Sequence, residues 1–247
     1  MKTRTLSQIL LLCLMLIAPS LFAKTYVVSV GVANYKELSS LVKTEKDAKS
    51  MSDLFKQKTQ DVILLTGKYA TKERIMKSLS DQFSRATKND VVVFFFSGHG
   101  YQGGICPYDM STSNISTGLS YKEIKAILKK SKAKNKIIIA DACYSGGLRD
   151  RGSADNSQSN SNDNVILFLS SRGNETSAES PLSTNGYFTK ALLRGLKGGA
   201  DTNRDKRISA KEIFTFVSDK VKKDTKDEQH PVMWGKFSDG FVLMDWN

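Results

Sequence analysis

The sequence predicts an α/β protein whose mainly parallel sheet carries helices on both faces. Two observations support this fold class. The apolar runs at residues 91–96 and 137–140 lack the alternation of a half-solvated strand, so both faces of each strand are expected to be buried. Segments with apolar residues at helical spacing separate these runs, and strands separated by helices favour parallel pairing.

The individual elements follow from local patterns, taken along the chain. Runs rich in β-forming residues predict strands at residues 25–32, 62–65, 91–96, 136–140, 165–169 and 240–244. Apolar residues at helical spacing predict helices over residues 44–58, after Thr71, after Ser120, and from Tyr187 to a stop at Gly198-Gly199. Thr71 is expected to cap its helix, and Ser120 with Glu123 forms a capping-box pattern. No internal repeat is present.

The first 23 residues have the pattern of a secretory signal peptide. Lys2 and Arg4 precede an apolar stretch at residues 9–18, and small Ala23 follows as the expected cleavage position. The apolar stretch is too short for a comfortable membrane span. We therefore expect export to the periplasm or outside the cell, no membrane association after removal of the signal, and one mature domain over residues 24–247.

The charge of the chain favours a solvated surface over a nucleic-acid groove. The formal net charge is +12, and removal of residues 1–23 leaves about +10. The basic residues are spread through helical stretches, and no aromatic-rich basic motif typical of nucleic-acid-binding proteins is present. We expect no nucleic-acid partner.

One polar segment interrupts the predicted domain. Residues 149–164 contain a single apolar side chain, Ala154. Such a segment buries too little apolar surface to offset the entropy of ordering it, so we expect a mobile surface loop that divides the domain without ending it.

A thiol and an imidazole follow two of the predicted strands. His99 lies between two glycines after one apolar run, and Cys143 follows the next run within residues 141–147. The carboxyl ends of strands are where open α/β sheets bind ligands, and a thiol attacks a carbonyl efficiently only as the thiolate, which an imidazole supports. The other mature-chain histidine, His230, is expected in a turn, and the other cysteine, Cys106, could pair with Cys143, although we expect Cys143 to be free.

The two loops resemble the signature loops of the caspase fold. The matching segments are residues 96–100 (Phe-Ser-Gly-His-Gly) and residues 141–146 (Asp-Ala-Cys-Tyr-Ser-Gly), with His99 and Cys143 separated by 44 positions. The chain is more similar to metacaspases and their bacterial relatives than to animal caspases, because Asp141 stands two residues before the cysteine and Ser-Gly follows Tyr144. Metacaspases commonly have His where this chain has Tyr144. The resemblance also includes residues 31–35, 45–54 and 187–196 and the final strand.

This resemblance implies a three-layer sandwich around a mainly parallel six-stranded sheet, and a cysteine endopeptidase with a Cys143–His99 dyad. The backbone N–H groups of Gly100 and Cys143 match the oxyanion donors of the family. Asp47, Ser97 and Asp141 match an acidic pocket that takes Arg or Lys before the cut, and a carboxylate can hold a guanidinium through two hydrogen bonds. Expected partners are therefore protein or peptide substrates with Arg or Lys at that position.

The resemblance also suggests self-processing in the interrupting loop. Caspase relatives are often cut between a large and a small part at this place. The interrupting loop at residues 149–164 contains two basic residues, Arg149 and Arg151. Because the resemblance implies cleavage after Arg or Lys, we expect self-cleavage after one of them.

Residues 201–212 fit the ligand spacing of a calcium-binding EF-hand loop. The candidate oxygen ligands are Asp201, Asn203, Asp205, Arg207, Ser209 and Glu212. Against calcium, Lys206 replaces the turn glycine, positive residues crowd the loop, and Ser209 with Glu212 also matches a helix capping box. The chemical step needs no cofactor, so calcium is a possible addition and not a requirement.

Two other functions stay open beside the peptidase. One is a catalytically silent caspase-fold module that binds a partner, which the atypical Tyr144 favours and the intact His99 and Cys143 oppose. The other is a calcium-responsive surface module, which depends on residues 201–212. The sequence does not indicate the natural substrate, the activation trigger or the oligomeric state.

Overall fold

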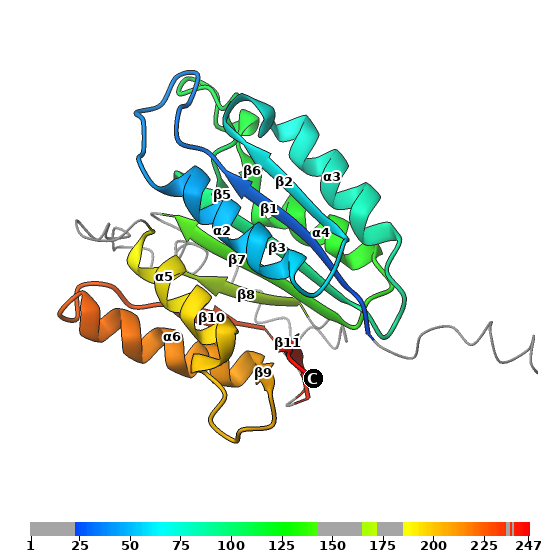
Figure 1. The fold of residues 1–247 in the computed structure, drawn as a ribbon. Helices are drawn as coiled ribbons and strands as arrows, with labels where there is room; N and C mark the ends of the chain where they lie inside the picture. The colour runs from blue at the N-terminus through cyan, green and yellow to red at the C-terminus, as the bar shows by residue number, and fades with distance from the viewer. Residues whose placement is uncertain (1–22, 143–164, 172–184, 236–237, 239) are drawn as a thin grey trace, which may run out of the picture.

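The structure is a computed structural model that describes residues 23–142, 165–171, 185–235, 238 and 240–247, and a six-stranded sheet forms its centre (Figure 1). The strands of this sheet are β1 (Thr25–Gly31), β2 (Val62–Thr66), β3 (Val91–Gly98), β7 (Asn135–Ala142), β8 (Val165–Leu169) and β10 (Val232–Trp234). They lie in the order β10-β8-β7-β3-β1-β2. All neighbours pair in parallel except β10, which is antiparallel to β8. The predicted mainly parallel sheet is confirmed.

Helices cover both faces of the sheet, as predicted (Figure 1). One face carries α2 (Thr44–Lys56), α5 (Tyr187–Arg194) and α6 (Ala210–Asp224), and the other carries α3 (Lys72–Ser84) and α4 (Tyr121–Lys130). Strand β3 shows why its sequence is apolar throughout. Val93 and Phe95 pack toward α2 and α5, whereas the alternate residues Val92, Phe94 and Phe96 pack toward α3 and α4. Both sides of this strand are therefore buried, which completes a three-layer sandwich.

The predicted helix caps are present in the structure. The Thr71 hydroxyl accepts a hydrogen bond from the Arg74 amide at 3.4 Å at the start of α3. Ser120 and Glu123 exchange both hydrogen bonds of a capping box at the start of α4. Helix α5 is followed by a turn at Gly195–Gly199 in which Gly198 has a φ of 109°, a left-handed conformation that favours glycine. These local signals located the starts of α3 and α4, whereas α5 ends at Arg194, before the predicted stop at Gly198-Gly199.

The final predicted strand forms, and it lies outside the central sheet. Residues 240–244 overlap β11 (Val242–Asp245), which pairs with β9 (Arg207–Ser209) in a separate two-stranded sheet. The sixth strand of the central sheet is β10 instead. It is three residues long and follows Pro231, so it is too short to show a periodic pattern.

Short elements follow β3 and β2. Strands β4 (Gly100–Tyr101), β5 (Gly104–Ile105) and β6 (Leu119–Ser120) form a small sheet immediately after His99. The single-turn helices η1 (Gly67–Tyr69) and η2 (Ile115–Thr117) lie before α3 and before β6. This small sheet returns the chain from the end of β3 to the start of α4.

Three predicted features lie outside the described residues: the signal peptide at residues 1–23 except its last residue Ala23, the interrupting loop at 149–164, and Cys143 with Tyr144. They stay predictions of the sequence. In the part of the chain that the structure describes, no helix combines the length and the apolar character needed to cross a membrane.

Candidate active site

The ends of β3 and β7, where the two signature segments begin, lie side by side in the sheet. These strands are direct neighbours, and their register pairs Ser97 with Asp141 and Gly98 with Ala142. His99 follows Gly98 directly. Cys143 follows Ala142 in the sequence and lies outside the described residues. The residue that precedes His99 therefore lies opposite the residue that precedes Cys143 in the sheet register.

The His99 ring is oriented by a backbone carbonyl of a neighbouring loop. Its Nε2 atom lies 2.9 Å from the Ser39 carbonyl oxygen and 3.3 Å from the Ser39 hydroxyl. A carbonyl oxygen can only accept, so Nε2 carries the hydrogen in this contact. In the neutral ring Nδ1 is then the nitrogen that can accept a proton. The contact thus selects the tautomer in which Nδ1 is the unprotonated nitrogen.

Tyr35 holds the backbone beside His99. Its hydroxyl accepts a hydrogen bond from the His99 amide at 2.6 Å, and the two rings lie 5.0 Å apart between centroids. This close approach explains Gly98. A Cβ atom at that position would lie 2.5 Å from the Tyr35 hydroxyl oxygen and 2.7 Å from Phe96, so only glycine fits without displacement.

An exposed carboxylate anchors the loop that carries Ser39. Glu37 accepts hydrogen bonds from the Ser111 hydroxyl at 2.8 Å and the Thr112 amide at 3.0 Å. These hydrogen bonds lower the pKa of Glu37, the Ser111 hydroxyl contributing most. Sequence reasoning missed Ser39 and Glu37, because a carbonyl contact leaves no side-chain signal and an exposed glutamate is common.

The structure brings Asp47, Ser97 and Asp141 together beside the strand ends. Asp47, in the first turn of α2, is 2% exposed, and its Oδ2 accepts a hydrogen bond from the Ser97 hydroxyl at 3.0 Å. Asp141, in β7, is 8% exposed. Both carboxylates flank Gly186, since a Cβ atom there would lie 3.2 Å from Asp141 Oδ2 and 3.7 Å from Asp47 Oδ2. Two buried acidic groups therefore share one small region.

Donors from the start of α5 contact this acidic pair. The Asn185 side-chain amide donates to Asp47 Oδ1 at 2.7 Å, and the Thr189 hydroxyl donates to Asp141 Oδ2 at 2.7 Å. Sequence reasoning missed both residues. Asn185 and Asp47 are separated by 138 positions, so no local pattern could pair them.

Burial and a neighbouring charge raise the pKa of Asp47 to about 7. Removal from water is the larger cause, and the Asp141 carboxylate adds to it. Hydrogen bonds from Asn185, Ser97 and the Gly186 amide act in the opposite direction and lower this pKa. The group therefore changes its charge near neutral pH.

The expected oxyanion donor Gly100 lies at the start of β4, directly after His99, and is half-buried. It pairs with Ile105 in the small sheet. The other expected donor, the Cys143 amide, lies outside the described residues.

The sequence and the fold of this chain resemble those of known proteins. The family model described as the caspase domain matches residues 24–242. The chain belongs to the caspase family. A search of curated proteins finds no match. Among solved structures, this caspase domain resembles the crystal structure of protein GSU0716 from Geobacter sulfurreducens, with a TM-score of 0.66 and 18% sequence identity over 91% of this chain and 98% of that chain. At this identity the likeness supports the fold alone.

The second mature-chain cysteine of this caspase domain is unsuited to catalysis. Cys106 is free and 3% exposed. Burial raises the pKa of its thiol to about 12, so the thiol stays protonated at neutral pH. His230 is also occupied elsewhere, since its Nε2 lies 3.1 Å from an Asp227 carboxylate oxygen just before β10. These environments leave Cys143 and His99 as the candidate dyad.

The calcium candidate of the caspase domain, residues 201–212, forms a tight polar loop before α6. Asp201 accepts from the amides of Asp205 and Lys206 at 3.2 and 3.0 Å, and Lys206 has a φ of 64°. Ser209 and Glu212 exchange both hydrogen bonds of the predicted capping box. Among the described residues, no group of three or more His, Cys, Asp or Glu side chains is arranged to hold a metal ion. Calcium binding stays a prediction.

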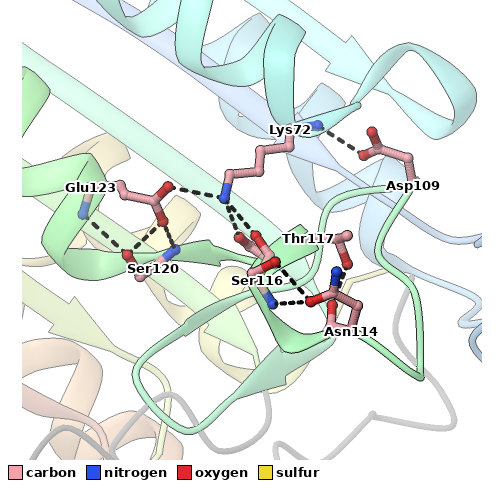
Figure 2. Close-up of polar contacts among 8 residues, drawn as sticks. Lys72, Asp109, Asn114, Ser116, Thr117, Ser120 and Glu123 are labelled. Carbon is pink, nitrogen blue, oxygen red and sulfur yellow. Dashed lines mark hydrogen bonds and ion pairs between the residues drawn. The ribbon is translucent and has the colours of Figure 1, made fainter.

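The partly buried Lys72 holds the loop that contains Ser111 and Thr112, the residues that contact Glu37. The Lys72 ammonium donates to the carbonyl oxygens of Ser116 at 2.9 Å and Gly118 at 2.7 Å, and it pairs with Glu123 at 2.9 Å. Figure 2 shows Lys72 reaching between Ser116 and Glu123. The Lys72 amide also donates to the Asp109 carboxylate at 2.9 Å. This network ties α3 and α4 to the loop whose residues 111 and 112 contact Glu37.

Proposed function

We propose that this caspase domain is an exported cysteine endopeptidase that hydrolyses peptide bonds after Arg or Lys. The observation that carries the proposal is the register of β3 and β7, which pairs Gly98 with Ala142, the residues that precede His99 and Cys143. The held tautomer of His99 supports it, because a Ser39 carbonyl at Nε2 leaves Nδ1 to take a proton.

The proposed chemistry runs through a covalent intermediate. His99 Nδ1 takes the proton of the Cys143 thiol, and the sulfur attacks the scissile carbonyl carbon. The negative oxygen of the tetrahedral intermediate accepts hydrogen bonds from the Gly100 and Cys143 amides. His99 then gives its proton to the departing amine. A water molecule, deprotonated by His99, cleaves the resulting thioester and regenerates the thiol.

The buried carboxylates support the proposed preference for a cationic residue before the cut. Asp47 and Asp141 flank Gly186 next to the strand ends, and a guanidinium or ammonium ion compensates negative charge in such a region. Ser97 contributes through its hydrogen bond to Asp47. A neutral side chain of the same shape would leave the carboxylates without a cation.

Peptide turnover tests the proposal. Fluorogenic peptides ending in Arg, Lys, Asp and citrulline, the neutral isostere of Arg, are offered to the mature chain under reducing conditions, with and without calcium and prior processing. We expect turnover after Arg and Lys, and its loss in Cys143→Ala and His99→Ala. Turnover after none of the four peptides would reject the peptidase in favour of the partner-binding module.

Self-processing and export are separate parts of the proposal. We expect wild-type protein, but not Cys143→Ala, to be cut after Arg149 or Arg151, as read by N-terminal sequencing. Identical intact bands would contradict self-cleavage. We expect the exported protein to begin at Lys24, and retention of residues 1–23 on the protein recovered outside the cytoplasm would contradict removal of the signal.

A further inference from the structure

The N-terminus of α5 faces the acidic pair through its backbone. The first amides of a helix have no partner within the helix. Here the Gly186 amide, at the N-cap, donates to Asp47 Oδ1 at 3.3 Å, and the Thr189 amide donates to Asp141 Oδ2 at 3.3 Å. One helix end therefore contacts two carboxylates that come from α2 and from β7.

Two side chains of the same segment repeat these contacts. Asn185 donates to the same Asp47 oxygen as the Gly186 amide, and the Thr189 hydroxyl donates to the same Asp141 oxygen as its own amide. Thr189 is fully buried and Asn185 is 8% exposed. Each carboxylate thus receives one backbone donor and one side-chain donor from the start of α5.

Such donors matter because like charges oppose each other in a buried region. Burial and the neighbouring carboxylate both favour the neutral acid, whereas hydrogen bonds to carboxylate oxygens favour the ion. Asp141 is the ionisable group that acts on Asp47 among the described residues, and the groups that face Asp47 from β3 and from the start of α5 are the neutral donors Ser97, Asn185 and Gly186. The balance between the neutral and ionised forms of Asp47 therefore depends on these neutral donors.

We infer that Asn185 and Thr189 are positioning residues that direct the Asp47 and Asp141 carboxylates and favour their ionised forms, and so set the preference for a cationic residue before the cut. The inference rests on the proposed function. On this inference, substrate selection depends in part on residues 185–189, which are far in sequence from both signature loops. Thr189 is the sharper probe, because its hydroxyl can be removed with little change in shape.

The test compares Thr189→Val with wild type on Arg and citrulline peptides. We expect the KM of the Arg peptide to rise about tenfold, because a hydrogen bond to a charged group is lost. We expect kcat to stay within about twofold of wild type. The KM of the citrulline peptide should not change, and the pH at which the KM of the Arg peptide falls should be higher than in wild type. Thr189→Ser, which keeps the hydroxyl, is expected to restore the wild-type KM, and Asn185→Ala to raise KM in the same way.

A matched control removes a buried threonine hydroxyl elsewhere. The Thr225 hydroxyl donates to the Val221 carbonyl at 2.8 Å at the end of α6, so Thr225→Val is expected to leave both KM values unchanged. An equal loss on the Arg and citrulline peptides in Thr189→Val, or no loss on either, would overturn the inference.

A binding measurement separates this inference from the proposed function. If wild type cleaves neither peptide, the proposed peptidase fails, and calorimetry with agmatine, a small guanidinium compound, still decides the inference. Agmatine binding that is about tenfold weaker in Thr189→Val supports it. Equal affinity, or no agmatine binding to wild type at millimolar concentration, rejects it.

Discussion

The two sides of the candidate site are held in opposite ways. His99 is half-buried and is oriented by Ser39 and Tyr35, whose loop is anchored by the exposed Glu37. Asp47 and Asp141 are buried and receive donors from β3 and from the start of α5. A base must exchange protons with substrate and water, whereas a charge-selecting pair gains strength from exclusion of water. In the proposed peptidase this contrast assigns turnover to His99 and substrate recognition to the two carboxylates.

The largest effect is expected at the dyad. Cys143→Ala and His99→Ala are each expected to lower kcat on the Arg peptide by about a thousandfold or more, because nucleophile and base act as one unit. The double variant should lose little beyond either single variant. Thermal unfolding serves as the control, and the unfolding midpoint of each variant should match wild type. Additive losses in the double variant would contradict a dyad.

The next largest effect sharpens the recognition side. Asp141→Asn keeps the shape of the side chain and removes one charge, and we expect kcat/KM on the Arg peptide to fall by about a hundredfold. The citrulline peptide should change little, because it brings no charge to the pocket. A parallel loss on both peptides would show that Asp141 acts on turnover, and would remove the contrast between the two sides.

The acidic side should also respond to pH in a defined direction. The pKa of Asp47 is raised to about 7, so the carboxyl is neutral below that pH and ionised above it. KM for the Arg peptide should therefore fall several-fold as pH rises from about 6 to about 8, and KM for the citrulline peptide should not. Asp47→Asn should abolish this dependence. A KM that rises with pH would contradict the assignment.

The same group makes a prediction for stability. Because the folded-state pKa lies above the ordinary value of 3.8, the folded protein keeps a proton that the unfolded chain releases between pH 3.8 and about 7. The contribution of Asp47 to the free energy of unfolding therefore decreases as pH rises through that window. Denaturant titrations of Asp47→Asn should show a flatter pH dependence than wild type, and an unchanged slope would count against the shifted pKa.

The smallest effect is expected on the exposed support of His99. Glu37→Gln keeps an acceptor oxygen and removes the charge that strengthens the contacts with Ser111 and Thr112. We expect kcat to fall about twofold to threefold with KM unchanged, because exposed polar contacts contribute little. Glu73→Gln, on the first turn of α3, is the matched control. A change in KM for Arg would place Glu37 on the recognition side.

The sequence by itself determined the fold class and indicated the proposed chemistry. Parallel strands buried on both faces have long apolar runs, so residues 91–96 and 137–140 identified the centre of the sheet. Capping residues marked helix ends because their hydrogen bonds span three positions, as at Ser120 and Glu123. The reactive side chains His99 and Cys143 stood in loops after those strands, where their residue types were visible without any coordinates.

Only the tertiary structure decided which groups act together. The register of β3 and β7 depends on packing along both strands. The sixth strand of the central sheet, β10, was not predicted because a three-residue strand carries no periodic signal. The partner of the His99 ring is a backbone carbonyl, which every residue possesses. Asn185 and Thr189 meet carboxylates 138 and 48 positions away. Contacts of this range are set by how the helices pack on the sheet, and no local pattern encodes them.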